Sequence, residues 1–331
     1  MRISNGLTVN TYLRNLDNIQ NQKYKNEIRL STGKNIVNLA DAPEKLVRVK
    51  NMDFLISDNE KYKYIIDQSI REMQAAEDKL QSISDKIGEI RQLAVDSTHA
   101  GAAGNTYSLG VYVRGLLEDI IKEANTDFNG KLLFSGTKST VDSITPELPQ
   151  TTNLPFEIVQ EQATPDNPSG LKIYFKGNFE DRIINKDSKT TEKINVTANE
   201  MFGNGGTEFF ENIIKLYNVL SFKSDGTPRQ ETDPLSKFDV DEINNLQAKL
   251  AVTNEQLNKL TAQLSTRRSR MENISSQMSE EVIRYKELKT INEDTDYAKV
   301  TMDLRLEEIA LQYSLQVGSN LLQKSLMDFL R

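Results

Sequence analysis

The chain contains no cysteine, no tryptophan and a single histidine among its 331 residues. Without cysteine, disulfides, thiol nucleophiles and thiolate metal ligands are excluded. The histidine, His99, has no second imidazole to share a metal with, so we expect it to be an ordinary loop residue. No segment approaches the roughly 18 consecutive apolar residues that a membrane span needs. We therefore expect no metal, no cofactor, no catalytic residue and no membrane contact.

Basic residues do not outnumber acidic ones: 41 Lys and Arg stand against 48 Asp and Glu, and the net charge is −7. Nucleic-acid binding needs a concentrated basic face, so that function is not expected. Residues 1–50 carry nine Lys or Arg against four acids, whereas residues 291–331 carry four against seven. This opposite charge could favour pairing of the two ends within or between molecules, and solvated helix faces are an equal alternative. Residues 1–30 hold no compact apolar block, so we expect no cleaved signal peptide.

A long heptad pattern dominates what the sequence does contain. Fourteen positions alternate at spacings of three and four, and eleven of them are apolar: Ile243, Leu246, Leu250, Thr253, Leu257, Leu260, Leu264, Arg267, Met271, Ile274, Met278, Glu281, Tyr285 and Leu288. A repeat of 3.5 residues is typical of a long helix that buries one edge against another helix. We expect the partner helix to come from the other end of the chain.

The N-terminal part shows helical periodicity as well. A first helix should end at Gly33, and Pro43 fits the first turn of a second, very long helix that the glycines at 101 and 104 close. A third helix is expected from about Tyr107 to Ala124, before the Asn129-Gly130 turn.

The middle of the chain changes period. The segments 171–176 and 193–197 are short and rich in β-formers, and seven of the eight prolines fall between Pro146 and Pro234. A helix from about Glu208 to Leu220 follows, then a linker, the heptad helix and a last helix that begins near residue 293. We expect domains at 1–40 (an assembly helix, disordered in the monomer), 41–137 (stalk), 138–206 (β-rich), 207–292 (stalk) and 293–331 (assembly helix).

The predicted fold is mainly α with a small β insertion, in which a long antiparallel coiled-coil stalk is built from both ends of the chain. The expected stalk seam consists of Leu80, Ile83, Ile87, Ile90, Leu250, Leu257, Leu260, Leu264, Met271 and Ile274.

The last helix carries two apolar stripes. The first stripe is Val300, Leu304, Leu311, Leu315, Leu322 and Phe329, and the second stripe is Met302, Leu306, Ile309, Tyr313 and Val317. Once the long helices have paired, we expect the terminal helices to lack a partner in the same molecule, so that neighbouring copies supply one. The expected assembly interface is Ile3, Leu7, Leu13, Leu16, Ile19, Val300, Leu304, Leu311, Leu315, Leu322 and Phe329.

The sequence motifs that could indicate ligand binding or catalysis are weak. Gly203-Asn204-Gly205-Gly206 lacks the Lys-Ser/Thr of a phosphate loop, so a turn is the better interpretation. A surface adhesin or cell-wall enzyme on a helical stalk would need converging carboxylates in residues 138–206. The acids there show no spacing for acid–base work: Glu157, Glu161, Asp166, Glu180 and Asp181.

Both ends of the chain resemble the flagellin superfamily. The segment Leu30–Pro43 is similar to its N-terminal signature, with a Leu-Ser-Thr-Gly turn, a Val-Asn pair and an Asp before the second helix. Met271-Glu272-Asn273 and Glu293–Ala298 resemble its C-terminal domain. The resemblance covers about residues 1–137 and 240–331, and it implies a subunit whose termini pair into coiled coils.

Two branches of the superfamily remain open. Lys131–Lys138, the segment 194–203 and the Phe329-Leu330-Arg331 ending resemble the hook-associated protein 3 branch, which joins hook to filament. Phe128-Asn129-Gly130-Lys131 instead resembles the filament flagellins. The first branch implies a secreted, extracellular structural subunit of the flagellum, with no enzymatic activity, exported by the flagellar type III system. Its implied partners are identical subunits, hook-associated protein 1, flagellin and an export chaperone on the C-terminal helix.

Overall fold

The computed structural model describes residues 2–36, 42–99, 105–144, 152–231 and 233–329. The chain divides into two compact units. The terminal unit comprises Met1–Lys61 and Met278–Arg331, and the central unit comprises Tyr62–Gln277. Each unit is considered by itself below.

The chain is mainly helical, as predicted. The α-helices are α1 (Arg2–Thr32), α2 (Pro43–Thr98), α3 (Thr106–Ala124), α4 (Ala198–Phe202), α5 (Glu208–Ser221), α6 (Lys237–Glu293) and α7 (Tyr297–Phe329), with 3-10 turns at Val141–Ser143 and Asn204–Gly206. Gly33, with φ of 71°, follows α1, and Pro43 opens α2, which confirms the two boundaries expected there. The glycines 101 and 104 expected to close α2 lie outside the described residues.

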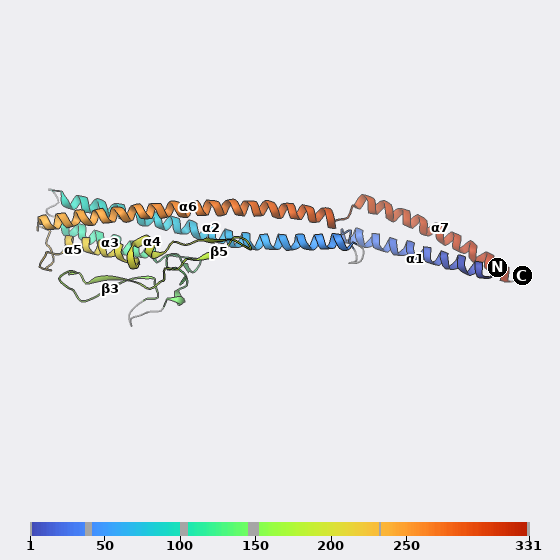
Figure 1. Ribbon diagram of the computed structural model, residues 1–331, viewed down its shortest axis with the longest axis horizontal. Coiled ribbons are helices and arrows are strands. Elements are labelled where there is room, and N and C mark those ends of the chain that lie inside the picture. Colours follow the sequence, from blue (N-terminus) through green and yellow to red (C-terminus); the bar gives the residue numbers. More distant parts are fainter. Residues whose placement is uncertain (1, 37–41, 100–104, 145–151, 232, 330–331) are drawn as a thin grey trace. The chain divides into compact units, whose positions relative to one another are not determined.

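Helices α2 and α6 run antiparallel and side by side (Figure 1). In the central unit, Asp67, Glu77 and Ser84 of α2 bond to progressively earlier residues of α6. The Ser275 hydroxyl donates to Asp67 over 2.6 Å, the Arg268 guanidinium pairs with Glu77 at 3.0 Å, and the Ser84 hydroxyl bonds Asn258 at 3.0 Å. This falling order is the signature of antiparallel helices. The predicted fold class is therefore confirmed.

Nine of the ten predicted seam residues are buried: Leu80, Ile83, Ile87, Ile90, Leu250, Leu257, Leu260, Leu264 and Met271. Ile274 is half-buried, and Ser275 occupies the buried position instead, at 7% exposure. Further along, Val282 is buried while Leu288 is 39% exposed. An α-helix repeats every 3.6 residues rather than every 3.5, so a strict heptad drifts around it, and α6 follows that drift after Met271.

The strands form three small antiparallel pairs in the central unit. These are β1 (Asp127–Phe128) with β2 (Lys131–Leu132), β3 (Phe156–Gln160) with β4 (Leu171–Phe175), and β5 (Ile183–Asn185) with β6 (Thr191–Lys193). The strand predicted at 193–197 is wrong beyond Lys193. Thr197 instead caps α4 in a capping box with Glu200, and this local hydrogen bonding ends the extended segment.

The short strands share an aromatic core with the helices. Phe156 of β3 lies 5.4 Å from Phe202 of α4 and 5.6 Å from Phe210 of α5, measured between ring centroids. All three side chains are at most 1% exposed. Two-stranded sheets are marginal alone in water, so burial against α4 and α5 stabilises them.

Replacing Leu257 by Ala should test the α2–α6 seam. Leu257 is fully buried, and truncating such a residue leaves a cavity that costs about 2–5 kcal/mol of unfolding free energy. Val252→Ala on the same helix is the matched control, because Val252 is 68% exposed and should change stability by less than about 0.5 kcal/mol. Urea denaturation followed by circular dichroism measures both. Equal effects would contradict the seam.

Candidate assembly interface

Helices α1 and α7 pack against each other in the terminal unit. The Asn26 amide donates to Glu307 over 2.8 Å, and Lys23 lies 3.9 Å from Glu308. Beyond the helix ends, the backbones of Lys34 and Asp294 form an isolated antiparallel β-bridge. The pairing is antiparallel, and Lys23 of α1 meets the acidic Glu308 of α7. The expectation that neither terminal helix has a partner in the same molecule is therefore wrong. The two ends cover each other within one molecule, which is one of the two pairings that their opposite charge allowed.

A glycine of α7 allows α1 and α7 to approach each other closely near the N-terminal part of α1. Gly318 of α7 is buried, and a Cβ added there would lie 2.1 Å from the hydroxyl oxygen of Tyr12. Glycine leaves room for the end of the Tyr12 side chain, which a larger residue at this level of α7 would displace. This close contact favours the observed register of α1 on α7, although Gly within a helix weakens the helix itself.

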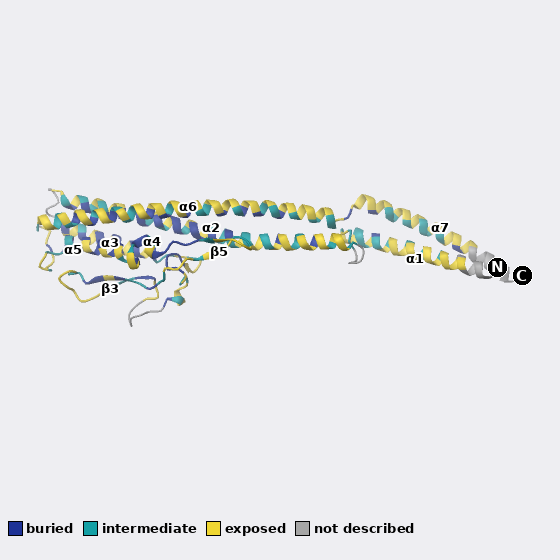
Figure 2. Ribbon diagram, in the orientation of Figure 1, coloured by how far each residue is buried: buried dark blue, intermediate teal, exposed yellow. Residues whose placement is uncertain are grey.

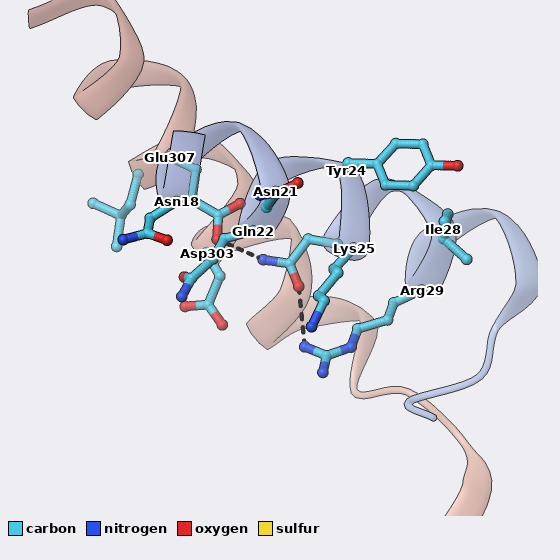
Figure 3. Close-up of a pocket in the computed structure, with 11 residues that line it drawn as sticks. Asn18, Asn21, Gln22, Tyr24, Lys25, Ile28, Arg29, Asp303 and Glu307 are labelled. Carbon is cyan, nitrogen blue, oxygen red and sulfur yellow. Dashed lines mark hydrogen bonds between the residues drawn. The ribbon is translucent and has the colours of Figure 1, made fainter. Parts of the chain in front are cut away.

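The middle of the α1–α7 interface is polar. Asn26 is only 5% exposed, and its side chain joins Glu307 to Arg29, whose guanidinium donates to Asn26 over 3.1 Å. A groove of about 1040 Å³ opens beside these residues (Figure 3). Buried polar residues specify register at some cost in stability. This layer and the Tyr12–Gly318 contact are two features that the sequence analysis missed.

The second stripe of α7 is open to solvent, and much of α7 is coloured as exposed in Figure 2. Its members are 49–67% exposed: Met302, Leu306, Ile309, Tyr313 and Val317. A row of five large apolar side chains on one helix face is far more than the scattered exposed apolar residues of ordinary surfaces. This stripe has the properties of a face that a partner covers.

The predicted interface residues fall into three groups. Val300 is buried, and Leu16, Ile19, Leu304 and Leu311 are half-buried, facing the α1–α7 pairing. Leu7, Leu13 and Leu315 are 71%, 52% and 53% exposed. The side chains of Ile3, Leu322 and Phe329 lie outside the described residues. The interface list left out the second stripe, all of whose members are exposed.

A charged cluster lies where the four helices of the terminal unit meet. Lys289 of α6 bonds Asp53 of α2 at 2.6 Å and lies 3.7 Å from Glu293, which also pairs with Lys34. The hydrogen bond from Lys289 holds the pKa of the Asp53 carboxyl below its usual range. A carboxyl with a lowered pKa stabilises the fold above about pH 4, and this contribution is lost as the pH falls through the lowered pKa.

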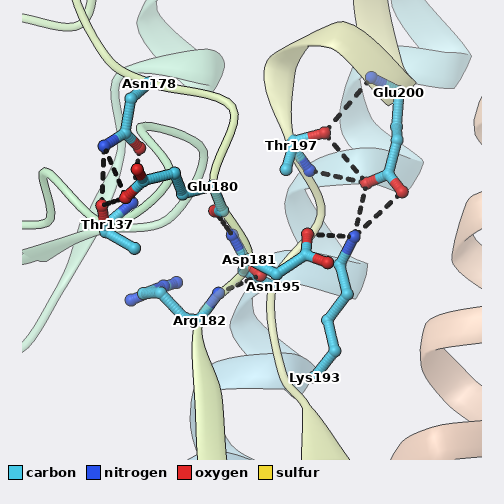
Figure 4. A network of polar contacts seen from close by, with 9 residues as sticks. All are labelled: Thr137, Asn178, Glu180, Asp181, Arg182, Lys193, Asn195, Thr197 and Glu200. Atoms are coloured by element: carbon cyan, nitrogen blue, oxygen red, sulfur yellow. Dashed lines mark hydrogen bonds and ion pairs between the residues drawn. The ribbon is translucent and has the colours of Figure 1, made fainter.

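The acids of the central strand-rich segment are each bound locally. Glu157 pairs with Lys176, Glu161 with Lys172 at 3.4 Å, and Asp181 with Lys193 at 2.6 Å. Figure 4 shows the surrounding network, in which Glu180 accepts a hydrogen bond from Thr137 over 2.7 Å. Four of the five acids named from the sequence thus have separate partners instead of converging on one cavity.

Two further findings concern only the described part of the chain. Within it, no group of His, Asp and Glu side chains is arranged to hold a metal ion, and no helix is both long and apolar enough to cross a membrane. His99 is exposed at the end of α2.

Comparison with known proteins identifies the N-terminal part of the chain. Residues 3–139 match the family model of the bacterial flagellin N-terminal helical region. No curated protein matches by sequence. The resemblance to the flagellin superfamily is thereby confirmed over this region.

Three solved structures are similar in fold. A Vibrio parahaemolyticus protein assigned as a flagellar hook-associated protein is 17% identical, with a TM-score of 0.60 over 76% of this chain and 99% of its own. Flagellar hook associated protein-3 of Legionella pneumophila is 13% identical, with a TM-score of 0.56 over 73% and 99%. The flagellar junction protein of the same organism is 11% identical, with a TM-score of 0.54 over 76% and 99%. At these identities the similarity concerns the fold.

Gly318→Ala should loosen α1 from α7. The added methyl group would collide with Tyr12, and overpacking of this kind typically costs about 1–3 kcal/mol. Amides of α1 should then exchange faster with solvent deuterium, measured by mass spectrometry. Gly88→Ala in α2 is the matched control, because nothing lies within 4 Å of its added Cβ, and it should stabilise the protein by roughly 0.5–1 kcal/mol. Unchanged α1 exchange in the Gly318 variant would contradict the proposed register contact.

Proposed function

We propose that this chain, whose residues 3–139 form a bacterial flagellin N-terminal helical region, is a structural subunit of the flagellum that joins the hook to the filament. The role is non-enzymatic, and the subunit assembles through its terminal helices. The fold of hook-associated and junction proteins, found at TM-scores of 0.54–0.60, supports the choice of the junction branch.

The exposed second stripe of α7 is the observation that carries this proposal. Val300, Leu304 and Leu311 of the first stripe are buried or half-buried, whereas all five members of the second stripe are 49–67% exposed in the isolated subunit. Burial of apolar side chains contributes roughly 25 cal/mol per Å², so covering this row would drive association strongly. We assign the second stripe, with Leu7 and Leu13 of α1, to contacts with neighbouring copies.

The proposed partners follow from a position between two assemblies. Identical subunits form the junction, with hook-associated protein 1 on one side and flagellin on the other. An export chaperone covers the C-terminal helix before secretion, which would shield the second stripe from aggregation. The proposed location is extracellular, in the flagellum, after export by the type III system. The absence of cysteine suits a chain that is exported unfolded.

Flagellin, the filament subunit itself, is the second candidate. The observation that favours it is the Phe128-Asn129-Gly130-Lys131 element, which forms the β1–β2 turn with Asn129 at φ of 52°. The two candidates differ in where the protein lies and in whether it polymerises. Antibody labelling of intact flagella should mark a single band at the hook end for a junction subunit and the whole filament for flagellin. Purified protein added to filament fragments should elongate them only if it is flagellin.

Polar substitution of the second stripe should abolish assembly without unfolding the subunit. In a strain lacking the native gene, the double variant Leu306→Asn with Tyr313→Asn should reduce labelling at the hook end at least tenfold, because both side chains are more than half exposed and lose only partner contacts. Circular dichroism of the purified variant should match the parent protein.

The matched control is Gln312→Asn, an exposed polar position on the same helix outside the stripe, which should assemble normally. Normal incorporation of the double variant would refute the assigned interface. Continuous labelling of the filament by the parent protein would instead refute the junction role and favour flagellin.

A further inference from the structure

The break between α6 and α7 contains neither proline nor glycine. Helix α6 ends at Glu293 and α7 begins at Tyr297, so only Asp294, Thr295 and Asp296 separate them. Asp296 favours the break locally, because its carboxylate accepts a hydrogen bond from the Lys299 amide over 3.1 Å and caps α7. The intrinsic helix propensities of Asp and Thr are mediocre rather than prohibitive. A contact from outside the linker adds to this cap.

The segment after α1 supplies that external contact. The Thr295 amide donates to the Gly33 carbonyl over 2.9 Å, and the Asn35 amide donates to the Glu293 carbonyl over 2.7 Å. These bonds flank an antiparallel bridge between Lys34 and Asp294. We call residues 33–35 and 293–295 together the clasp. In a continuous helix the Thr295 amide would bond to residue 291 and the Glu293 carbonyl to residue 297, so the clasp competes directly with helical hydrogen bonds.

Side chains tie the clasp to the α1–α7 pair. The Arg29 guanidinium donates to the Asn35 carbonyl over 3.1 Å and to Asn26, which in turn bonds Glu307 of α7. Lys34 forms an ion pair with Glu293. The clasp is therefore supported only while α1 lies on α7, because Arg29 and Asn26 belong to α1.

We propose that the clasp is a conformational switch that decides whether α6 and α7 are two helices or one. With the clasp closed, α6 and α7 are separate helices, and α7 packs on α1. With the clasp open, residues 237–329 form one continuous helix. Release of α1 and joining of the helices are coupled, because the clasp amide and carbonyl groups then return to helical hydrogen bonds. The switch does not depend on the flagellar assignment.

Asn35→Pro tests the switch, since proline removes the amide that donates to Glu293 and Lys34 is already extended. In the full-length variant, deuterium exchange at the amides of residues 296–298 should slow at least tenfold, because the first turn of α7 lacks helical acceptors only while the break persists. Asn35→Ala is the matched control, since it keeps the backbone donor and should exchange like the parent. Unchanged or faster exchange in Asn35→Pro, or equal slowing in Asn35→Ala, would overturn the proposal.

A second proline provides the converse test. Thr295→Pro combined with Asn35→Pro should cancel the slowing, because proline within the joined segment prevents a continuous helix. Spin labels on cysteines introduced at the exposed positions Glu280 and Arg305 give an independent readout in a chain that has no other cysteine. A continuous helix predicts one narrow distance near about 38 Å between these Cα positions.

That distance should be found in Asn35→Pro and not in the double-proline variant. Its absence in Asn35→Pro would also overturn the switch. Should Asn35→Pro fail to fold, Lys34→Glu takes its place, because the new carboxylate repels Glu293 and opens the clasp. The same slowing of exchange and the same narrow distance are expected, and the lack of either would overturn the switch.

Discussion

Pairing of segments from opposite ends of the chain is the constraint on which the rest of this structure depends. Long amphipathic helices cannot keep one apolar face in water, so each must find a partner along its length. In the central unit α2 covers α6, and in the terminal unit α1 covers α7. Within the central unit, the short strands obtain their core from Phe202 and Phe210 of α4 and α5.

The spacing of apolar residues predicted much of this fold, because a helix that buries one face has apolar residues at regular intervals. The heptad from Ile243 identified α6, and Gly33 and Pro43 marked two helix boundaries. The same regularity misled at Ile274, since an ideal heptad does not follow the drift of a real helix, and Ser275 is buried instead. The strand predicted at 193–197 ended early because a capping box at Thr197 outweighed β propensity. Such local polar competition has no periodic signature.

The candidate interface was predictable in composition but not in orientation. Both stripes of α7 could be read from spacing, yet only the α1–α7 packing shows that the second stripe is the open one. The apolar pattern did not single out Gly318 or Asn26. In the structure, Gly318 leaves room for Tyr12, and Asn26 joins Glu307 to Arg29, so small and polar residues contribute to the α1–α7 contact. Pairwise contacts between distant residues decide these roles, and a single sequence carries no direct sign of them.

A subunit that must stay soluble and later assemble faces conflicting demands on its apolar surface. Folding α1 onto α7 resolves part of the conflict, because the first stripe is then protected within the molecule. The second stripe stays exposed and keeps the capacity to bind a partner. A clasp made of two backbone hydrogen bonds and one ion pair is weak enough to be replaced by helical bonds of the same kind, so the two arrangements of α7 would differ little in hydrogen-bonding free energy. Contacts with a neighbour, made only in one arrangement, would then be sufficient to choose between them.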